Sequence, residues 1–262
     1  MIATQYINST TQKPGPYKDY EVINVLKWKN SRWKSLCPFY MRTDGNEICV
    51  NPGNIIFENF YQGLKVYDAV YKNTVYASRF HSGKPEHLWW KFEPVNEPGK
   101  TSFHDDEYGD IMVNEDENIN YDLYFRWRNS LWDCENPIRH PNRMHRHKNT
   151  KFSLVIDTNN TEIRMDYLTS RREIYLKEYI RLAKKTPEYT ILLNKLKSGK
   201  NIMLCEVDVP AQNKWGSFGI LTDENNNICE LTIEHLEILL NDLNAPFGHG
   251  LCLAYSLLRE LI

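Results

Sequence analysis

The stretch from Phe57 to Tyr71 constrains the fold of this chain more than any other, because it sets three polar groups among apolar neighbours. On a helix, Glu58, Gln62 and Lys65 share one face, since they lie four and seven residues apart. The opposite face would carry Phe60, Leu64, Tyr67 and Tyr71. Such a narrow polar stripe suits the wall of a cleft, where burial tunes an acid and an amine. A solvated surface helix shows the same spacing, so the pattern needs context.

Length and composition indicate a folded globular protein. The chain has 262 residues, of which 41% are hydrophobic and 13% aromatic, enough for a substantial core. The net charge is −2, and no block of basic residues favours nucleic-acid binding by counterion release. No apolar run approaches the roughly 18 residues of a membrane-spanning helix, and the first 17 residues are too polar for a signal peptide. We therefore expect a soluble, intracellular, cytoplasmic protein without a membrane partner.

Cysteine and histidine spacing points away from metal sites. The six cysteines are scattered, and none forms a Cys-x-x-Cys pair, which argues against a zinc ribbon and a disulfide framework. Several lie in apolar runs, where a free thiol acts as a small hydrophobe. His140, His145 and His147 lack the nearby cysteine or the His-x-x-x-His spacing of a metal site. We expect neither a bound metal nor a cofactor.

The order of the local patterns predicts one α+β domain, rich in helices and built around a small β-sheet. Residues 1–19 contain little that could pack, so we expect a flexible N-terminal arm. The domain would span residues 20–262, with an irregular insertion or lid at about 84–165, where prolines and an acidic run interrupt the regular patterns. The acidic run itself is typical of a solvated loop.

Two segments of the expected insertion could contact a ligand. Aromatic and cationic residues interleave from Tyr124 to Arg128, a composition that can stack on a flat ring and hold a phosphate, with Trp127 as the stacking residue. Aromatic residues are also typical of a core, and that alternative stays open. The segment after Pro137 is basic, so Arg139 could face an anionic group, although a solvated loop fits the same composition.

The second half of the chain predicts several helices. Residues 166–185 form the longest helical pattern, with Arg171 near its start. Thr186 and Thr232 are expected N-caps of two further helices, the first with a proline in its first turn. An apolar helix follows at the C-terminal end.

Two places in the last third could carry chemistry. Residues 201–208 form the clearest strand, an apolar run that leads to Glu206 and Asp208, where a carboxylate could take part in catalysis or simply be solvated. At the start of the last helix, Gly248-His249-Gly250 would let backbone N–H groups approach a phosphate or carboxylate. A plain tight turn explains these glycines about as well.

Taken together, these features resemble the NADAR family. Its helix motif, Glu-h-y-f-Gln-a-x-Lys, is similar to residues 58–65, where the Glu, Gln and Lys coincide without a gap. Further similarity covers residues 33–39, 193–206, 215–216 and 248–261, and residues 166–175 resemble a helix of phage and giant-virus members.

The resemblance implies an enzyme that cleaves N-glycosidic bonds, on ADP-ribosylated guanine or on phosphoribosyl-type intermediates. Such cleavage passes through an oxocarbenium-like state, which suits Glu58 as stabilising carboxylate or base and Asp208 as a second carboxylate. Lys65 would hold a phosphate or position the carboxylate, and Gln62 would bind a ribose hydroxyl. The other expected substrate contacts are Trp127 on the base, Arg139, Arg171 and His249 on the diphosphate, and Trp215 and Gly248.

Two other functions fit the same residues. A non-catalytic protein could bind ADP-ribose or a nucleotide and signal through the acidic insertion. A nucleotide- or DNA-modifying transferase could use the same scaffold. In each case the expected partner is an ADP-ribose-like or nucleotide-like ligand, with ADP-ribosylated nucleic acid as one form of it.

Overall fold

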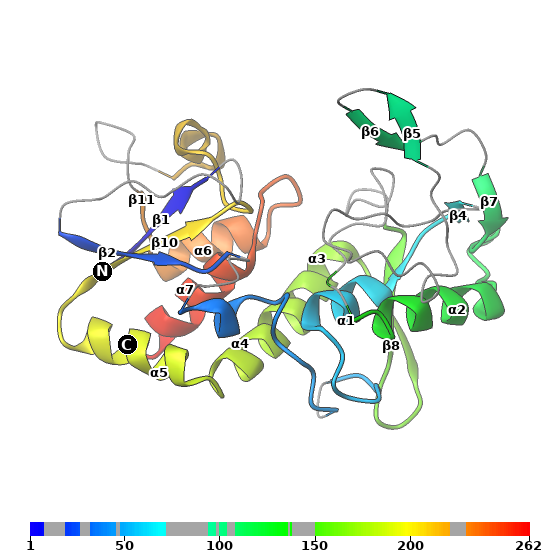
Figure 1. Ribbon diagram of the computed structural model, residues 1–262, viewed down its shortest axis with the longest axis horizontal. Helices are drawn as coiled ribbons and strands as arrows, with labels where there is room; N and C mark the ends of the chain where they lie inside the picture. The colour runs from blue at the N-terminus through cyan, green and yellow to red at the C-terminus, as the bar shows by residue number, and fades with distance from the viewer. Residues whose placement is uncertain are drawn as a thin grey trace. The chain divides into compact units, whose positions relative to one another are not determined.

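The structure, a computed structural model, describes residues 1–7, 19–26, 32–45, 48–71, 94–97, 100–103, 108–135, 137, 150–220 and 229–262. Helices combine with small mixed sheets, so the fold class is α+β, as expected (Figure 1). Residue contacts divide the chain into two compact units. Unit 1 comprises Met1–Met41 and Arg171–Ile262, and unit 2 comprises Arg42–Ser170.

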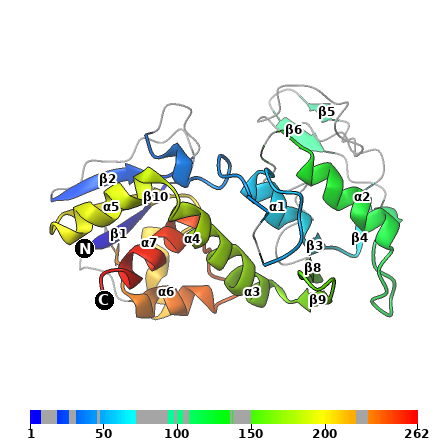
Figure 2. The ribbon, with the colours of Figure 1, turned by 90° about the horizontal axis from the view of Figure 1, so that it is seen from below.

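Within the described residues, unit 1 is built on a four-stranded sheet with the order β11-β1-β10-β2 (Figures 1 and 2). Its strands are β1 (Ile2–Tyr6), β2 (Tyr20–Asn24), β10 (Asn201–Glu206) and β11 (Cys229–Glu230). β10 pairs in parallel with β1 and β2, and β11 pairs antiparallel with β1. Parallel strands usually lie in sheets whose two faces are both covered by other elements, which explains the continuous apolar run of β10.

The N-terminal residues belong to this sheet, so the expectation of a flexible arm over residues 1–19 is wrong for residues 2–6. β1 lies between β10 and β11, and Ile2 pairs with Ile202. Ile2 and Ala3 are 1% and 0% exposed. β1 is short, and its stability comes from a partner strand 200 residues later in the chain, so no local pattern marks it. Residues 8–18 lie outside the described residues.

Three helices of unit 1 begin where the sequence predicts, whereas the single helix expected over residues 166–185 is divided between a first turn, a π-helix and a separate α-helix. The helices of this unit include α4 (Lys177–Ala183), α5 (Pro187–Lys197), α6 (Ile233–Leu240) and α7 (His249–Arg259). The Thr186 hydroxyl accepts the Tyr189 N–H at the start of α5, and the Thr232 hydroxyl accepts the His235 N–H at the start of α6. A π-helix, Arg171–Leu176, precedes α4, and the short 3₁₀ helices are Lys34–Leu36 and Gln212–Phe218.

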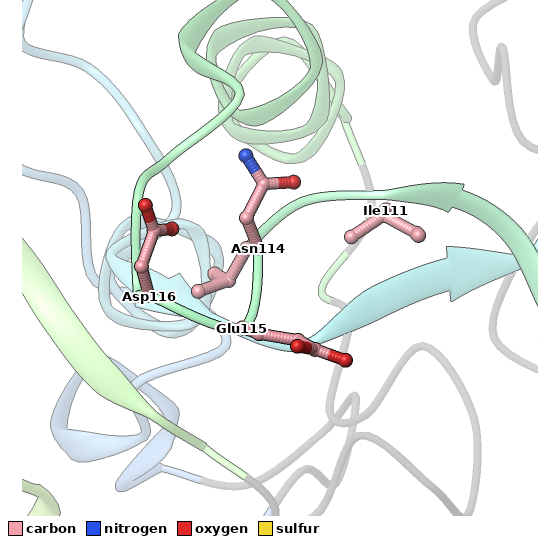
Figure 3. A pocket seen from close by; sticks show the side chains of 5 residues that line it. Ile111, Asn114, Glu115 and Asp116 are labelled. Carbon is pink, nitrogen blue, oxygen red and sulfur yellow. The ribbon is translucent and has the colours of Figure 1, made fainter.

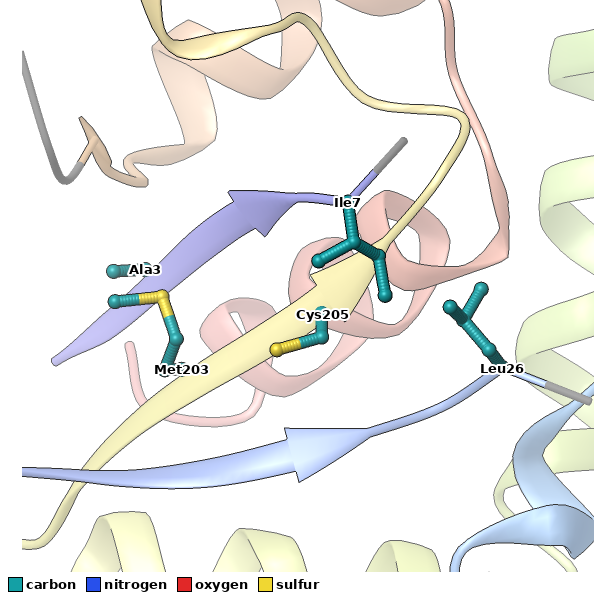
Figure 4. Packing of buried hydrophobic residues seen from close by; sticks show 5 residues of the cluster. All are labelled: Ala3, Ile7, Leu26, Met203 and Cys205. Atoms are coloured by element: carbon teal, nitrogen blue, oxygen red, sulfur yellow. The ribbon is translucent and has the colours of Figure 1, made fainter. Parts of the chain in front are cut away.

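The central strand β10 is buried on both faces. α7 packs against β10 and β1, and α5 packs against β10. Side chains alternate along a strand, so Glu206, which faces α7, places Met203 and Cys205 on the other face. There they form an apolar cluster with Ala3, Ile7 and Leu26, seen in Figure 4 with α7 behind the sheet.

Unit 2 combines short helices with small antiparallel sheets. Its helices are α1 (Phe57–Gly63), α2 (Tyr121–Trp132) and α3 (Tyr167–Ser170). One sheet has the order β3-β8-β9, formed by β3 (Lys65–Val66), β8 (Phe152–Ile156) and β9 (Glu162–Met165). The described residues of this unit also form two strand pairs: β4 (Ala69–Tyr71) with β7 (Tyr108–Ile111), and β5 (Pro94–Glu97) with β6 (Lys100–Phe103).

The segment expected to be an irregular insertion, at about 84–165, supplies regular parts of this unit. α2 packs against α1, and β8 is the central strand of the three-stranded sheet. The expectation is therefore wrong for residues 121–132 and 152–165. Long-range packing stabilises these elements, and packing of that kind leaves little trace in local sequence.

All six cysteines are buried free thiols, in agreement with their spacing. No helix among the described residues combines the length and the apolar content that crossing a bilayer requires.

Candidate functional site

The candidate site is carried by α1, which is shorter than the sequence pattern predicts. The helix ends at Gly63, and Lys65 begins β3 instead of continuing the helix. Gly63 fits closely against α2, since a Cβ at this position would lie 2.5 Å from Nε1 of Trp132. Beyond it, the Leu154 N–H donates to the carbonyl of Leu64 over 2.7 Å, as β8 takes over the backbone pairing.

Contacts from α2 and from Cys134, two residues after its end, hold α1 in place. The Trp132 indole N–H donates to the carbonyl of Phe60 over 3.2 Å, and the two rings stack with centroids 5.9 Å apart. The amide of Asn59 donates to the carbonyl of Cys134 over 3.2 Å. Every residue of α1 is buried. Its polar side chains are therefore fixed in a packed environment rather than exposed along a surface helix.

Glu58, Gln62 and Lys65 form one hydrogen-bonded chain. The amide nitrogen of Gln62 donates to Oε1 of Glu58 over 2.8 Å, and Nζ of Lys65 donates to the amide oxygen of Gln62 over 2.9 Å. Their exposed fractions are 8%, 4% and 2% in that order. The first pair lies one helical turn apart on α1, whereas Lys65 reaches Gln62 from β3. The three residues meet as predicted, although only two are on the helix.

Two aromatic rings flank the Lys65 ammonium. Nζ lies 4.8 Å from the ring centre of Tyr61 and 5.7 Å from that of Tyr167, distances at which a cation is attracted to a ring face. Burial lowers the pKa of Lys65 to about 8, and the negative charge of Glu58 acts in the opposite direction. Desolvation outweighs this attraction because the direct acceptor of the ammonium is a neutral amide.

This arrangement offers a carboxylate, an amide and an amine in a desolvated setting. A carboxylate there can stabilise developing positive charge, because water does not screen it. An ammonium whose pKa has been lowered toward neutrality donates a proton more readily than an ordinary lysine. The same groups could instead bind a polar ligand without reacting.

Trp127, the predicted stacking residue, lies in the same unit but in its core. Its exposed fraction is 3%, and its ring meets that of Tyr67 edge-on, with centroids 6.2 Å apart. The core alternative for the aromatic residues of α2 therefore holds for Trp127.

Unit 1 contains a second buried pair of charged groups, formed by Glu206 and His249. Nδ1 of His249 lies 2.8 Å from Oε2 of Glu206, and Nε2 lies 2.8 Å from the carbonyl oxygen of Val25. Both ring nitrogens face acceptors, so each must carry a proton and the ring is an imidazolium. Glu206 also accepts the backbone N–H groups of Gly250 at 2.9 Å and of Val207 at 2.7 Å.

These contacts shift both pKa values toward the charged forms. Burial opposes ionisation of Glu206, but the charge of His249 and the hydrogen bonds to the carboxylate outweigh it and lower the pKa to about 2. Burial likewise favours neutral His249, yet the charge of Glu206 and the two hydrogen bonds of the ring raise the His249 pKa above its usual value. Both shifts favour the charged forms of the two side chains.

The glycines beside His249 allow the end of β10 to approach α7. A Cβ on Gly248 would lie 2.7 Å from Cβ of Asp208, and one on Gly250 would lie 3.2 Å from Cβ of Glu206. The N-terminus of α7 thus already holds a carboxylate of the protein. The N–H group of Gly250 thus approaches a carboxylate, as one interpretation of Gly248-His249-Gly250 predicts, but this carboxylate belongs to the protein and not to a ligand.

Arg171 and Trp215 are also buried in unit 1, each 2% exposed. The guanidinium of Arg171 donates to the carbonyls of Ala245 at 3.1 Å and Leu239 at 3.0 Å, and also to that of Leu240. These carbonyls lie at and just beyond the C-terminus of α6, where a cation is favourable. The expectation that Arg171 grips a diphosphate is therefore not supported by its contacts.

The predicted site residues thus fall into two sets. Glu58, Gln62 and Lys65 meet in unit 2, while Asp208, which is exposed, lies near Gly248 in unit 1. Arg139 lies outside the described residues. The sequence interpretation overlooked Tyr167 beside Lys65, and it preferred Asp208 to Glu206.

Strand alternation was the signal for Glu206. It stands two residues after Leu204 and therefore shares a buried face with it. For Tyr167 no comparable signal exists, because it reaches Lys65 only through the fold of unit 2.

An open pocket in unit 2 is lined by Ile111, Val113, Asn114, Glu115 and Asp116 (Figure 3). The carboxylates of Glu115 and Asp116 point in different directions, and both residues are exposed, as expected of the acidic run. Glu58, Gln62 and Lys65 are not among the residues that line this pocket. Among the described residues, no cluster of His, Cys, Asp and Glu could hold a metal ion.

Comparison of the chain with protein-family models, with curated proteins and with solved structures found no match.

Proposed function

We propose that this chain is an N-glycosidase that hydrolyses the bond between an ADP-ribosyl or phosphoribosyl group and a base. The observation that carries the proposal is the buried chain of Glu58, Gln62 and Lys65. It combines a carboxylate with a protonated amine in a desolvated place. The resemblance of residues 58–65 to the NADAR helix motif supports the same reaction.

In the proposed reaction the bond between the anomeric carbon and the base nitrogen breaks, and a water oxygen takes the place of the base. Glu58 stabilises the positive charge that develops on the sugar, or removes a proton from the attacking water. Lys65, with its pKa of about 8, is mostly protonated at neutral pH and donates a proton to the departing base. These steps use unit 2 residues only, and a role for Asp208 stays a prediction.

The decisive test is Glu58→Gln. We expect it to reduce release of ADP-ribose from an ADP-ribosylated guanine oligonucleotide by roughly 10²- to 10⁴-fold, the usual effect of losing an acid or base group. Chromatography of the incubated oligonucleotide measures the product, and calorimetry should show nearly unchanged affinity for ADP-ribose. Glu115→Gln is the matched control, because it removes an exposed carboxylate of the same unit and should leave hydrolysis unchanged.

The outcomes separate the candidate functions. Unchanged hydrolysis in Glu58→Gln would remove the catalytic assignment. Binding of ADP-ribose by the wild-type protein with no product would favour a non-catalytic binding protein. Product that forms only when an acceptor is present would favour a transferase.

A further inference from the structure

The amide of Gln62 is engaged at both ends by the protein. Its nitrogen donates to Glu58 at 2.8 Å, and its oxygen accepts from Lys65 at 2.9 Å. Gln62 is 4% exposed. The sequence predicted that this amide binds a ribose hydroxyl, but a ligand would have to displace one of these two charge-assisted hydrogen bonds.

Lys65 depends on this amide. Among the described residues, Oε1 of Gln62 is the one hydrogen-bond acceptor that the structure gives to Nζ of Lys65. The other close groups are the ring faces of Tyr61 and Tyr167, which attract a cation but accept a proton poorly. The negative charge of Glu58 also attracts the ammonium of Lys65, but the Gln62 amide lies between the two groups.

We propose that Gln62 is a positioning residue, which holds the Lys65 ammonium and the Glu58 carboxylate at opposite ends of its amide and favours the charged form of Lys65. An amide suits this place because it offers a donor at one end and an acceptor at the other. A carboxylate at residue 62 would attract Lys65 but repel Glu58. An apolar side chain would leave the ammonium without its acceptor.

The consequence for catalysis rests on the proposed function, but the inference can be measured without it. NMR titration of protein labelled with ¹³C at the lysine Cε reports the pKa of Lys65 directly, and the Lys65 signal is the one missing from Lys65→Arg. Gln62→Met retains the length of the side chain and removes both hydrogen bonds. Gln62→Glu retains the shape and adds a negative charge.

We expect the Lys65 pKa to be about 8 in the wild-type protein. Gln62→Met should lower it and Gln62→Glu should raise it, each by roughly one unit, the size of a shift from a single close charge or hydrogen bond. If hydrolysis is observed, the basic limb of its pH profile should shift in the same directions. A purely structural role would change the melting temperature without moving the Lys65 pKa.

Gln5→Met is the matched control. Gln5 is a buried amide of unit 1, 8% exposed, that accepts a hydrogen bond from the Cys205 thiol. Its replacement removes a buried amide but should leave the Lys65 pKa unchanged.

A Lys65 pKa within about 0.3 units of wild type in both Gln62 variants would overturn the inference, since a close charge should shift it further. If Gln62→Met does not fold, the direction of the shift in Gln62→Glu decides alone. Absence of hydrolysis by the wild-type protein would contradict the proposed function, whereas the pKa measurement would still test the role of Gln62.

Discussion

At the scale of single residues, two buried cations show how the nature of one partner sets the sign of a pKa shift. Lys65 donates to a neutral amide, so the cost of removing its charge from water prevails and its pKa falls. His249 faces a carboxylate at 2.8 Å, so attraction prevails and its pKa rises. Burial alone therefore does not predict the protonation of a group.

The Glu206 and His249 pair should make stability depend on pH. Glu206 titrates near 2 when folded against a usual value of 4.5, so its contribution is present above pH 4.5 and is lost as the pH falls toward 2. His249 has a raised pKa when folded, so its contribution is present below its usual value of 6.5 and is lost as the pH rises through the folded value. The pair should stabilise the protein most between pH 4.5 and 6.5.

Urea unfolding across this pH range measures the effect. Near pH 5.5, Glu206→Gln should cost about 3–5 kcal/mol, because it leaves a buried imidazolium without its counter-charge. Glu173→Gln is the control in the same unit, since Glu173 pairs with Lys177 near the surface and should cost less than about 1 kcal/mol. Equal costs for the two variants would contradict the assigned role of the buried pair.

At the scale of elements, the start of α7 is determined by its fit to the end of β10. The Gly248 N–H donates to the carbonyl of Asp208 over 2.7 Å, and the Gly250 N–H donates to Glu206 over 2.9 Å. Side chains at residues 248 and 250 would occupy the space that Asp208 and Glu206 already fill. The glycines of this segment thus serve the contact between strand and helix.

Gly248→Ala should destabilise the protein by about 1–3 kcal/mol, the usual cost of overpacking, because the new Cβ would lie 3.0 Å from the backbone oxygen of Asp208. Gly216→Ala is the matched control in the same unit. Nothing lies within 4 Å of a Cβ at residue 216, so this change should be neutral or stabilise by less than about 1 kcal/mol. Thermal unfolding compares the two, and equal melting temperatures would refute the packing argument.

At the scale of the whole molecule, each unit has its own core and its own buried polar network. The hydrogen-bonded chain of Glu58, Gln62 and Lys65 belongs to unit 2. The ion pair of Glu206 and His249 belongs to unit 1. Units with separate cores can open separately, with different free energies. Weakening one network should therefore affect chiefly the unit that contains it.

Hydrogen exchange of Glu206→Gln tests this independence. Exchange should accelerate in β1, β10 and α7, which surround Glu206, while the amides of α1 and β8 in unit 2 keep their protection. Mass spectrometry of peptides from the two units provides the comparison. Equal acceleration in β8 would show that the chain unfolds as one cooperative body.

Local sequence determined the parts of this protein whose energies lie between near neighbours. The caps at Thr186 and Thr232, the apolar strand at residues 201–206 and the meeting of Glu58 with Gln62 all depend on residues within a few positions of one another. These features follow from hydrogen bonds and side-chain spacing that the order of residues fixes directly.

Tertiary structure decided the rest, because the partners come from distant parts of the chain. β1 is a strand through its pairing with β10, and Lys65 leaves the helix because β8 pairs with its backbone. His249 and Arg171 look like ligand-binding residues in sequence, yet a carboxylate and helix-end carbonyls far along the chain satisfy them. A buried charge must find a partner, and which partner it finds depends on the packing of the whole unit.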